Sequence, residues 1–502
     1  MLRTNILANL FGSGWIALLT LIATPIQIHL LGVEAYGLIG LIAVLQIIFG
    51  TLDLGLSASV TQSIASDVSD GRQESSPIIR SAATIYWLMA FVIAGLLWLA
   101  AGQIATRWLK PQALDSETVL TAVRTIGLYV AIRWPVAFYT GALNGIQRMD
   151  VQNLVKAGAA TLRISVGIIV IVVTKSVTAF LAWFAISAVI ELLAFIAATH
   201  RLIPNLGFRP YFSMEAVRSV WRFSLTMAGI AVLSMLITQL DRIFVSKLLS
   251  LSALGYYTLA YTTGIAISLL QTSINTASLP AFAQAAAQDE ASLVRRYMKV
   301  SELMAYFIAL PSFILVFFGS DILRVWVGAD GARGAGLPLM LLSVGFFINA
   351  IVSNAYIASV ATRRANIPAI VNFVAILIYA PALYLLISRY GIAGAAFCWA
   401  VLNFCYLCSL VPAVHHKVVR APLADWLWRC LAVPSLLAIA IFLPLKSASA
   451  LLAHEAATWI ALAIAIAIYA AGAFLLMSQN LRAELSKLGF LGVFTPSSRR
   501  AA

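Results

Sequence analysis

Arginine and acidic side chains interrupt long apolar stretches of this 502-residue chain. If such a stretch crosses a membrane, a mid-membrane arginine costs at least ~2.5 kcal/mol, so each one needs a bound anion or a carboxylate partner. A guanidinium stays charged when desolvated, and its planar donors match phosphate and carboxylate oxygens. Arg133 has the strongest claim to anion binding, because Trp134 and Pro135 follow it and a kink there opens backbone groups towards a cavity. The alternative is an ion pair of Arg133 with Glu191 or Asp53.

Two further arginines lie in the neighbouring apolar stretches. Arg163 follows Lys156 by seven residues, which places both on one face of a helix, two turns apart. That face could guide an anion inward, or Arg163 could pair with Glu191. Arg124 precedes Arg133 by nine residues and so lies on the opposite side of a straight helix. We expect Arg124 to reach towards the outer membrane interface.

Asp241 and Arg242 form an adjacent pair inside another apolar stretch. Their side chains point about 100° apart on a helix, so they do not bond to each other along one face. Each needs another partner or water, which makes this segment a candidate gate. Asp241 could also carry a coupled proton or cation, because a carboxylate within a membrane is a plausible titrating site; a purely structural role is the alternative.

The composition requires these residues to sit in a polytopic membrane protein. Hydrophobic residues make up 62% of the chain and charged residues only 10%, against about a quarter in soluble domains. A helix that crosses the membrane needs about 20 mostly apolar residues. Fourteen stretches meet this requirement: 8–31, 37–60, 81–105, 119–143, 154–174, 177–198, 223–246, 254–280, 301–319, 336–361, 367–388, 392–414, 430–447 and 457–478. We therefore predict an all-α fold of about 14 transmembrane helices.

The chain also repeats itself. Residues 30–66 match residues 248–284 at an offset of 218, and Gly145, Arg148 and Trp183 match Ala361, Arg364 and Trp399 at an offset of 216. Six predicted spans in each half give the halves one orientation, with an axis along the membrane normal. The predicted parts are an N-terminal six-helix lobe (1–198), a cytoplasmic connector (199–222), a C-terminal six-helix lobe (223–414), a loop with two additional helices (415–478) and a cytoplasmic tail (479–502).

Charge and loop length restrict the function classes. Most of the 33 Lys and Arg residues fall in alternate loops, which predicts cytoplasmic termini, and the first span is expected to be retained as a signal anchor. The net charge of +14 then reflects loops that face anionic lipid, not nucleic-acid binding. The longest polar stretch between spans, Thr199 to Arg222, leaves no room for a catalytic domain, and no nucleophile–base pair or metal cluster stands out. We predict a protein that is not an enzyme and uses no cofactor. The four cysteines, Cys398, Cys405, Cys408 and Cys430, are expected to be small buried packing residues.

Three short motifs carry a family resemblance. The segment Leu52-Asp53-Leu54-Gly55-Leu56-Ser57-Ala58-Ser59 resembles the end of the second helix in polysaccharide flippases of the Wzx type. Gln239-Leu240-Asp241-Arg242-Ile243 with Leu254-Gly255-Tyr256-Tyr257, and Gly391-Ile392-Ala393-Gly394-Ala395, are similar to later segments of that family. The resemblance covers about the first 415 residues. It implies membership of the multidrug/oligosaccharidyl-lipid/polysaccharide exporter superfamily.

This resemblance implies a flippase of the bacterial inner membrane. It would move undecaprenyl-pyrophosphate-linked oligosaccharide units from the cytoplasmic to the periplasmic leaflet by alternating access between the two lobes. The implied partners are this lipid-linked oligosaccharide, membrane lipids, and a glycan polymerase with other polysaccharide-assembly proteins. Arg133 and Arg163 are the first candidates for pyrophosphate. The further candidates are Arg242, Arg124, Asn144, Gln271 and Asn349 for substrate binding, and Asp241, Asp53 and Glu191 for gating or ion coupling.

Amide side chains suit sugar hydroxyls because they both donate and accept hydrogen bonds, with helix-to-helix bonds as the alternative. Other functions also stay open. A lipid II flippase of the MurJ type would carry arginines within its first helix, where this chain has only Arg3 before it. A multidrug cation antiporter would carry acidic residues in its first span, which here has none. A glycan polymerase or ligase would need larger outer loops.

Overall fold

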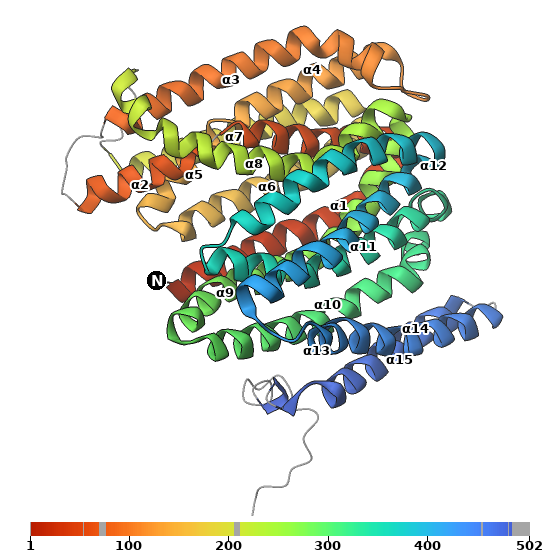
Figure 1. Cartoon of the computed structure of the whole chain (residues 1–502). Helices are drawn as coiled ribbons and strands as arrows, with labels where there is room; N and C mark the ends of the chain where they lie inside the picture. The colour runs from red at the N-terminus through yellow and green to blue at the C-terminus, as the bar shows by residue number, and fades with distance from the viewer. Residues whose placement is uncertain are drawn as a thin grey trace, which may run out of the picture. The chain divides into compact units, whose positions relative to one another are not determined.

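Helices account for the regular structure in the part of the chain that the computed structural model describes (Figure 1). That part comprises residues 2–53, 55–69, 77–204, 211–452, 455–479 and 481–483, with side chains described except at 2–11, 13, 68–69, 215–228 and 230–231. Positions 205–210 of the predicted connector and most of the predicted tail, 480 and 484–502, lie outside the described residues.

The α-helices are α1 (Leu2–Thr51), α2 (Leu56–Ser69), α3 (Pro77–Gln103), α4 (Ser116–Arg133), α5 (Val136–Gly145), α6 (Met149–Thr174), α7 (Val177–Leu202), α8 (Met214–Leu248), α9 (Leu251–Gln288), α10 (Glu290–Val327), α11 (Ala329–Ala361), α12 (Asn366–Val414), α13 (Leu423–Leu427), α14 (Val433–Leu451) and α15 (Glu455–Leu476). Short π-helical turns extend three of them: η1 (Ile104–Trp108), η2 (His415–Val419) and η3 (Trp428–Ala432).

The predicted number of spans agrees with these helices. Eleven helical stretches among the described residues are long and apolar enough to cross a membrane. Two of them, Gly14–Thr51 and Asn366–Val419, contain a glycine with non-helical backbone, Gly32 and Gly391, so each holds two helices. α8 coincides with one further predicted span. Eleven stretches, two of them double, together with α8 give the fourteen spans.

The predicted second span, residues 37–60, is not one continuous helix. α1 ends at Thr51 and α2 begins only at Leu56. The break has a local cause: Gly55 adopts a left-handed backbone (φ 81°), and the Asp53 carboxylate accepts hydrogen bonds from the Ser57 amide (3.2 Å) and hydroxyl (2.7 Å) at the start of α2.

The loops repeat their backbone geometry at the offset of 216. Arg148 and Arg364 each follow a residue in the left-handed region (φ 57° and 59°), and each arginine amide donates to the carbonyl five residues earlier (2.9 and 2.8 Å). This is the Schellman-type ending of a helix. Lys175 and Gly391, also 216 residues apart, are both left-handed (φ 49° and 59°). Equivalent loops therefore have equivalent conformations, as expected of a duplication.

Helices α1 and α9 meet through equivalent glycines. A Cβ on Gly37 would lie 2.6 Å from the Leu251 carbonyl oxygen, and a Cβ on Gly255 would lie 2.1 Å from the Val33 carbonyl oxygen. Since Val33 and Gly37 correspond to Leu251 and Gly255 at an offset of 218, the two contacts are reciprocal. Reciprocal contacts between equivalent residues are the mark of a two-fold relation, here between the start of the second helix of one repeat and that of the other.

Spatial proximity groups the chain into two compact units. One comprises Met1–Thr263, Trp326–Ala335 and Asn372–Ala395, and the other Gly264–Val325, Gly336–Val371 and Ala396–Ala502. In the first, α1 packs on α6, and α4 and α6 pack on α7. In the second, α14 and α15 lie side by side (Figure 1). The lobe boundaries at residues 198, 222, 414 and 478 stay predictions.

Two of the four cysteines differ from expectation. Cys398 and Cys430 are buried, as expected, but Cys405 and Cys408 are exposed on α12. The prediction was wrong for this pair because an apolar run does not distinguish a core-facing helix side from a lipid-facing one. No group of three potential metal ligands occurs among the described residues.

Candidate site around Glu191

Three helices of the first unit bring two arginines to one glutamate. Arg133 lies in the last turn of α4, Arg163 on α6 and Glu191 on α7, and α7 packs against both of the other helices. The Arg133 Nη2 atom is 2.8 Å from Glu191 Oε1, and the Arg163 Nη1 atom is 2.9 Å from Glu191 Oε2. Each carboxylate oxygen thus accepts from a different guanidinium.

The helix end places Arg133 at the open side of this cluster. α4 stops at Arg133 because Pro135 cannot continue its hydrogen bonding, and α5 restarts at Val136, which confirms the predicted kink. The exposed fraction of the side chain is 27% for Arg133, 12% for Arg163 and 1% for Glu191. Arg133 is therefore the member that an incoming ligand can reach.

Aromatic side chains support both guanidinium groups. The Tyr129 hydroxyl accepts from Arg133 (3.3 Å) and from Arg163 (3.2 Å), and its ring packs against Phe184 at 5.6 Å. The Arg163 guanidinium lies 6.0 Å from the Phe184 ring centre. The Trp183 indole donates to the Arg163 carbonyl (2.9 Å), which fastens α7 to α6. The ion pairs are thus held by neighbours that fix their orientation.

The cluster carries more positive than negative charge. Lys156, two turns before Arg163 on α6, lies close enough to interact electrostatically with Arg133 and Glu191. Three cations and one carboxylate leave an excess of positive charge in a partly buried position. Such a group can attract a phosphate, because one carboxylate compensates only one of the three positive charges.

Asp53, the other predicted partner of Arg133, is engaged elsewhere. Its carboxylate accepts from the Tyr86 hydroxyl and from Ser57. The structure thus selects Glu191, and not Asp53, as the carboxylate that pairs with Arg133.

Asp241 and Arg242 point apart, as predicted. Asp241 Oδ2 accepts from the Tyr257 hydroxyl (2.6 Å) on α9, and Oδ1 accepts from the Arg242 backbone amide (2.8 Å). The Arg242 guanidinium lies over the Tyr261 ring, 4.0 Å from its centre. Both charged side chains are buried. The predicted additional partners are therefore two tyrosines one turn apart on α9.

Arg124 and Asn144 lie outside the Glu191 cluster. The Arg124 guanidinium packs over the Trp98 ring of α3, 4.9 Å from its centre, and Asn144 lies next to the end of α5. Their predicted roles in substrate binding stay predictions.

The second unit holds a chain of amides in place of charges. Gln271 on α9 donates to Asn349 on α11 (3.0 Å), Asn349 donates to Asn403 on α12 (2.7 Å), and Asn403 donates to the Trp399 carbonyl (2.8 Å). These bonds join three helices, as in the helix-to-helix alternative. Gln271 and Asn349 also remain partly exposed.

The repeat relates the charged cluster to uncharged residues. At the observed offsets Asp53, Arg133, Lys156, Arg163 and Glu191 correspond to Gln271, Asn349, Asn372, Tyr379 and Leu407. Every residue of the first set has an ionisable side chain, whereas the second set contains three amides, a phenol and a leucine. The first repeat thus has charge at positions where the second repeat has uncharged residues, four of which can form hydrogen bonds.

Sequence reasoning missed the tyrosines and one acid. Tyr129 could have been found from its spacing, one helical turn before Arg133. Glu34 had no such signal: its buried carboxylate accepts from the backbone amides of Gln112, Ala113 and Leu114 (2.7, 2.9 and 2.9 Å). This contact ties the part of α1 that follows Gly32 to the loop before α4.

Comparison with known proteins identifies the family. The family model described as "Polysaccharide biosynthesis protein" matches residues 2–286. This chain belongs to that family. A Shigella flexneri protein described as "Putative O-antigen transporter" is 23% identical over 401 residues, which cover 79% of this chain and 94% of that protein. These are membrane transporters of polysaccharide biosynthesis and not enzymes, which confirms the predicted resemblance.

Solved structures show the same fold. The lipid II flippase MurJ in an inward closed conformation superimposes with a TM-score of 0.68 and 15% identity, covering 94% of this chain and 98% of that one. An inward-facing multidrug resistance MATE transporter of the MOP superfamily gives a TM-score of 0.65 and 15% identity, covering 80% and 96%. The predicted all-helical polytopic fold is therefore confirmed.

Proposed function

We propose that this chain is a flippase that moves undecaprenyl-pyrophosphate-linked oligosaccharide units from the cytoplasmic to the periplasmic leaflet of a bacterial inner membrane, with both termini in the cytoplasm. The family match, together with a relative described as an O-antigen transporter over 94% of that relative's length, supports a glycan-bearing substrate. The lipid tail of such a substrate can stay in hydrocarbon. Its glycan and pyrophosphate cannot cross without polar partners, because unpaired polar groups are costly there.

The excess positive charge around Glu191 is the single observation that connects this proposal to particular residues. Glu191 orients Arg133 and Arg163 while neutralising only part of their charge. Arg133, the more exposed of the two, offers its remaining donors to the pyrophosphate. Arg163 then follows as the phosphate moves inward, and Tyr129 holds both guanidinium groups in place.

The uncharged residues of the second repeat suit the glycan. Gln271 and Asn349 bind each other in the absence of substrate and are partly exposed, so sugar hydroxyls can exchange with these bonds. The division between the repeats follows the substrate, which has an anionic end and a neutral, hydroxyl-rich end.

Alternating access between the six-helix lobes moves the substrate in this proposal. Asp241 and Arg242 form the gate, since their tyrosine partners on α9 tie two helices together through bonds that can be broken and remade. Asp53 makes a similar helix-to-helix contact in the first repeat, where it lies near the break at Gly55 and accepts from Tyr86 on α3. A glycan polymerase and other assembly proteins are the proposed partners on the periplasmic side.

A lipid II flippase is the second candidate. The MurJ superposition, which covers 94% of this chain, shows a shared fold, and a shared fold does not distinguish lipid II transport from drug export. The segment Gly14–Leu31 contains neither arginine nor an acidic residue, which argues against both the expected lipid II site and the expected drug-antiporter site in the first helix.

The test is the sidedness of the lipid-linked glycan, measured with a glycan-modifying reagent that does not cross the membrane. Loss of this protein should leave the glycan on the cytoplasmic side, wild type should restore it, and Arg133→Ala should not. Arg133→Lys should rescue only in part, because a point charge cannot bind two oxygens at once. Arg333→Ala is the matched control, since Arg333 is an exposed arginine paired with Asp330.

Two results would contradict the proposal. Unchanged sidedness without the protein would rule out this lipid-linked glycan as the substrate, and lipid II would be the next substrate to assay. Full activity of Arg133→Ala, at wild-type protein level in the membrane, would remove the proposed role of Arg133.

A further inference from the structure

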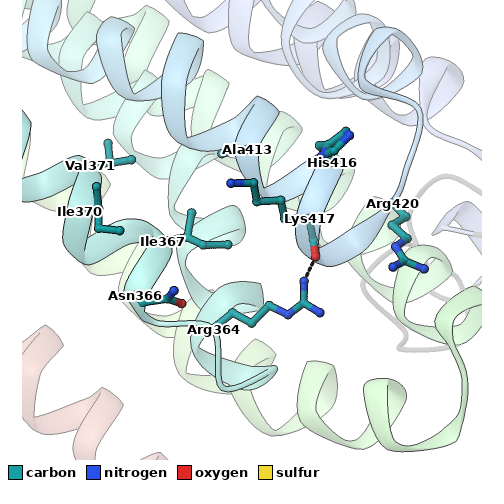
Figure 2. A pocket seen from close by; sticks show the side chains of 9 residues that line it. All are labelled: Arg364, Asn366, Ile367, Ile370, Val371, Ala413, His416, Lys417 and Arg420. Atoms are coloured by element: carbon teal, nitrogen blue, oxygen red, sulfur yellow. Dashed lines mark hydrogen bonds between the residues drawn. The ribbon is translucent and has the colours of Figure 1, made fainter.

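A basic pocket of about 640 Å³ lies at one end of the second unit, away from the residues discussed above. Figure 2 shows Arg364 and Asn366, from the turn between α11 and α12 and the start of α12, next to η2, with the Arg364 guanidinium directed at the backbone carbonyl of Lys417. The complete lining is Arg364, Asn366, Ile367, Ile370, Val371, Ala413, His416, Lys417 and Arg420. Its volume falls in the range of sites for small ligands, about 300–1,000 Å³.

The charges of this pocket are positive and largely uncompensated. The lining contains two arginines, a lysine and a histidine but no acidic residue. Arg420 has a partner outside the lining, Glu290, at 3.2 Å. Arg364 donates to the backbone carbonyl of Lys417, a contact that positions the guanidinium without neutralising it. In the part of the chain that the structure describes, no carboxylate lies within ion-pair distance of Arg364 or Lys417.

The internal repeat provides a direct comparison. Arg148 is the equivalent of Arg364 and occupies a loop of the same backbone geometry. Arg148 pairs with Asp150, with its Nε and Nη2 atoms 2.9 and 3.0 Å from the two carboxylate oxygens. The residue equivalent to Asp150 is Asn366, which lines the pocket. The second repeat therefore lacks the carboxylate that neutralises this arginine in the first.

The pocket also has an apolar side. Ile367, Ile370 and Val371 lie on the first part of α12, and Ile370 is 63% exposed. On the second part of α12, the exposed Cys405 precedes His416 by about three helical turns, which places the two residues near one face of the helix. A ligand that fits has an anionic head and an apolar tail.

We propose that this pocket binds the phosphate-bearing headgroup of an anionic phospholipid, with Arg364 and Lys417 on the phosphate and the acyl chain along the exposed face of α12. Arginine provides two parallel donors to phosphate oxygens, and lysine adds a point charge. The apolar wall distinguishes a lipid phosphate from free phosphate, which has nothing to place there. This site is separate from the proposed transport function, and its test does not require transport.

The experiment is native mass spectrometry of the full chain in detergent, titrated with phosphatidylglycerol, with phosphatidylethanolamine and inorganic phosphate as separate probes. Wild type should retain phosphatidylglycerol in preference to both other probes. Asn366→Asp, which installs the acid of the first repeat, and Arg364→Gln should each weaken phosphatidylglycerol binding roughly tenfold. Arg333→Gln, which removes an exposed cation elsewhere, should leave this binding unchanged.

Folding is checked by the thermal midpoint without lipid, which should be the same for Asn366→Asp and wild type because the first repeat tolerates this pair. Added phosphatidylglycerol should raise the midpoint of wild type more than that of the variant at the same lipid concentration. Equal phosphatidylglycerol binding by wild type and both variants would overturn the proposal. So would equal retention of phosphatidylethanolamine, or inorganic phosphate that displaces the lipid at similar concentration.

Discussion

Replacing Glu191 by glutamine tests whether one carboxylate holds two arginines in place. The amide has nearly the same shape, so packing is preserved while the negative charge is removed. One carboxylate oxygen becomes an amide nitrogen, a donor, facing a guanidinium donor at a distance where Arg133 or Arg163 now binds (2.8 or 2.9 Å). Two charge-assisted hydrogen bonds are therefore lost or weakened.

The expected loss of stability follows from burial. Removing one partner of a buried ion pair costs about 3–5 kcal/mol, because a charge is left without compensation. Arg133, 27% exposed, can recover part of this cost through water or lipid headgroups, whereas Arg163, 12% exposed, cannot. We expect the lower value, about 3 kcal/mol, which corresponds to roughly a hundredfold change in the ratio of folded to unfolded protein.

Thermal unfolding of the purified protein in detergent measures this change, with the amount of folded protein in the membrane as a second reading. The double variant Glu191→Gln/Arg163→Gln should recover most of the loss, because the most buried cation is removed with its partner. It should still fail to transport if Arg163 binds substrate. An unfolding midpoint of Glu191→Gln equal to that of wild type would refute the reasoning, and so would a double variant no more stable than the single one.

Two further substitutions test the packing of α9. Gly255→Ala should destabilise the protein by about 1–3 kcal/mol or prevent folding, because its Cβ would lie 2.1 Å from the Val33 carbonyl oxygen. The control is Gly95→Ala, where a Cβ meets nothing within 4 Å. Equal thermal midpoints of the two variants would contradict the expectation. Tyr257→Phe should cost about 1–3 kcal/mol, because it leaves an oxygen of the buried Asp241 carboxylate without its 2.6 Å hydrogen bond. An unchanged unfolding midpoint would show that Asp241 finds another donor.

Much of the fold follows from local properties of the sequence. The spans depend on apolar length alone, and the break after Arg133 follows from the missing amide of Pro135. The interruption after Thr51 was also encoded locally, by Asp53 and Gly55, but a continuous apolar count overlooks it. A turn that lies within an apolar run has to be read from its capping residues and not from hydropathy.

The partners of the charges could be predicted only as alternatives. Arg133 and Glu191 are 58 residues apart, and whether they meet depends on how α4 and α7 rotate about their axes. Periodicity places residues on a helix face but leaves the choice of facing helix open. The separation of Asp241 from Arg242 could be predicted, because it depends on one helix, whereas Tyr257 and Tyr261 belong to another.

The duplication allows the charges of the two repeats to be compared position by position. A duplicated chain begins with identical halves, so a charge present in one half and absent from the other reflects divergence between them. Arg133 and Asn349 occupy equivalent positions, as do Asp150 and Asn366. In each pair one repeat has an ionisable group where the other has a neutral amide. The proposed lipid-linked glycan, anionic at the lipid junction and neutral beyond it, accounts for the first pair, with a cation in the first repeat and a hydrogen-bonding amide in the second. The second pair runs the other way, because the acid neutralises Arg148 in the first repeat and its absence leaves Arg364 of the second repeat uncompensated, which agrees with a separate anion site there.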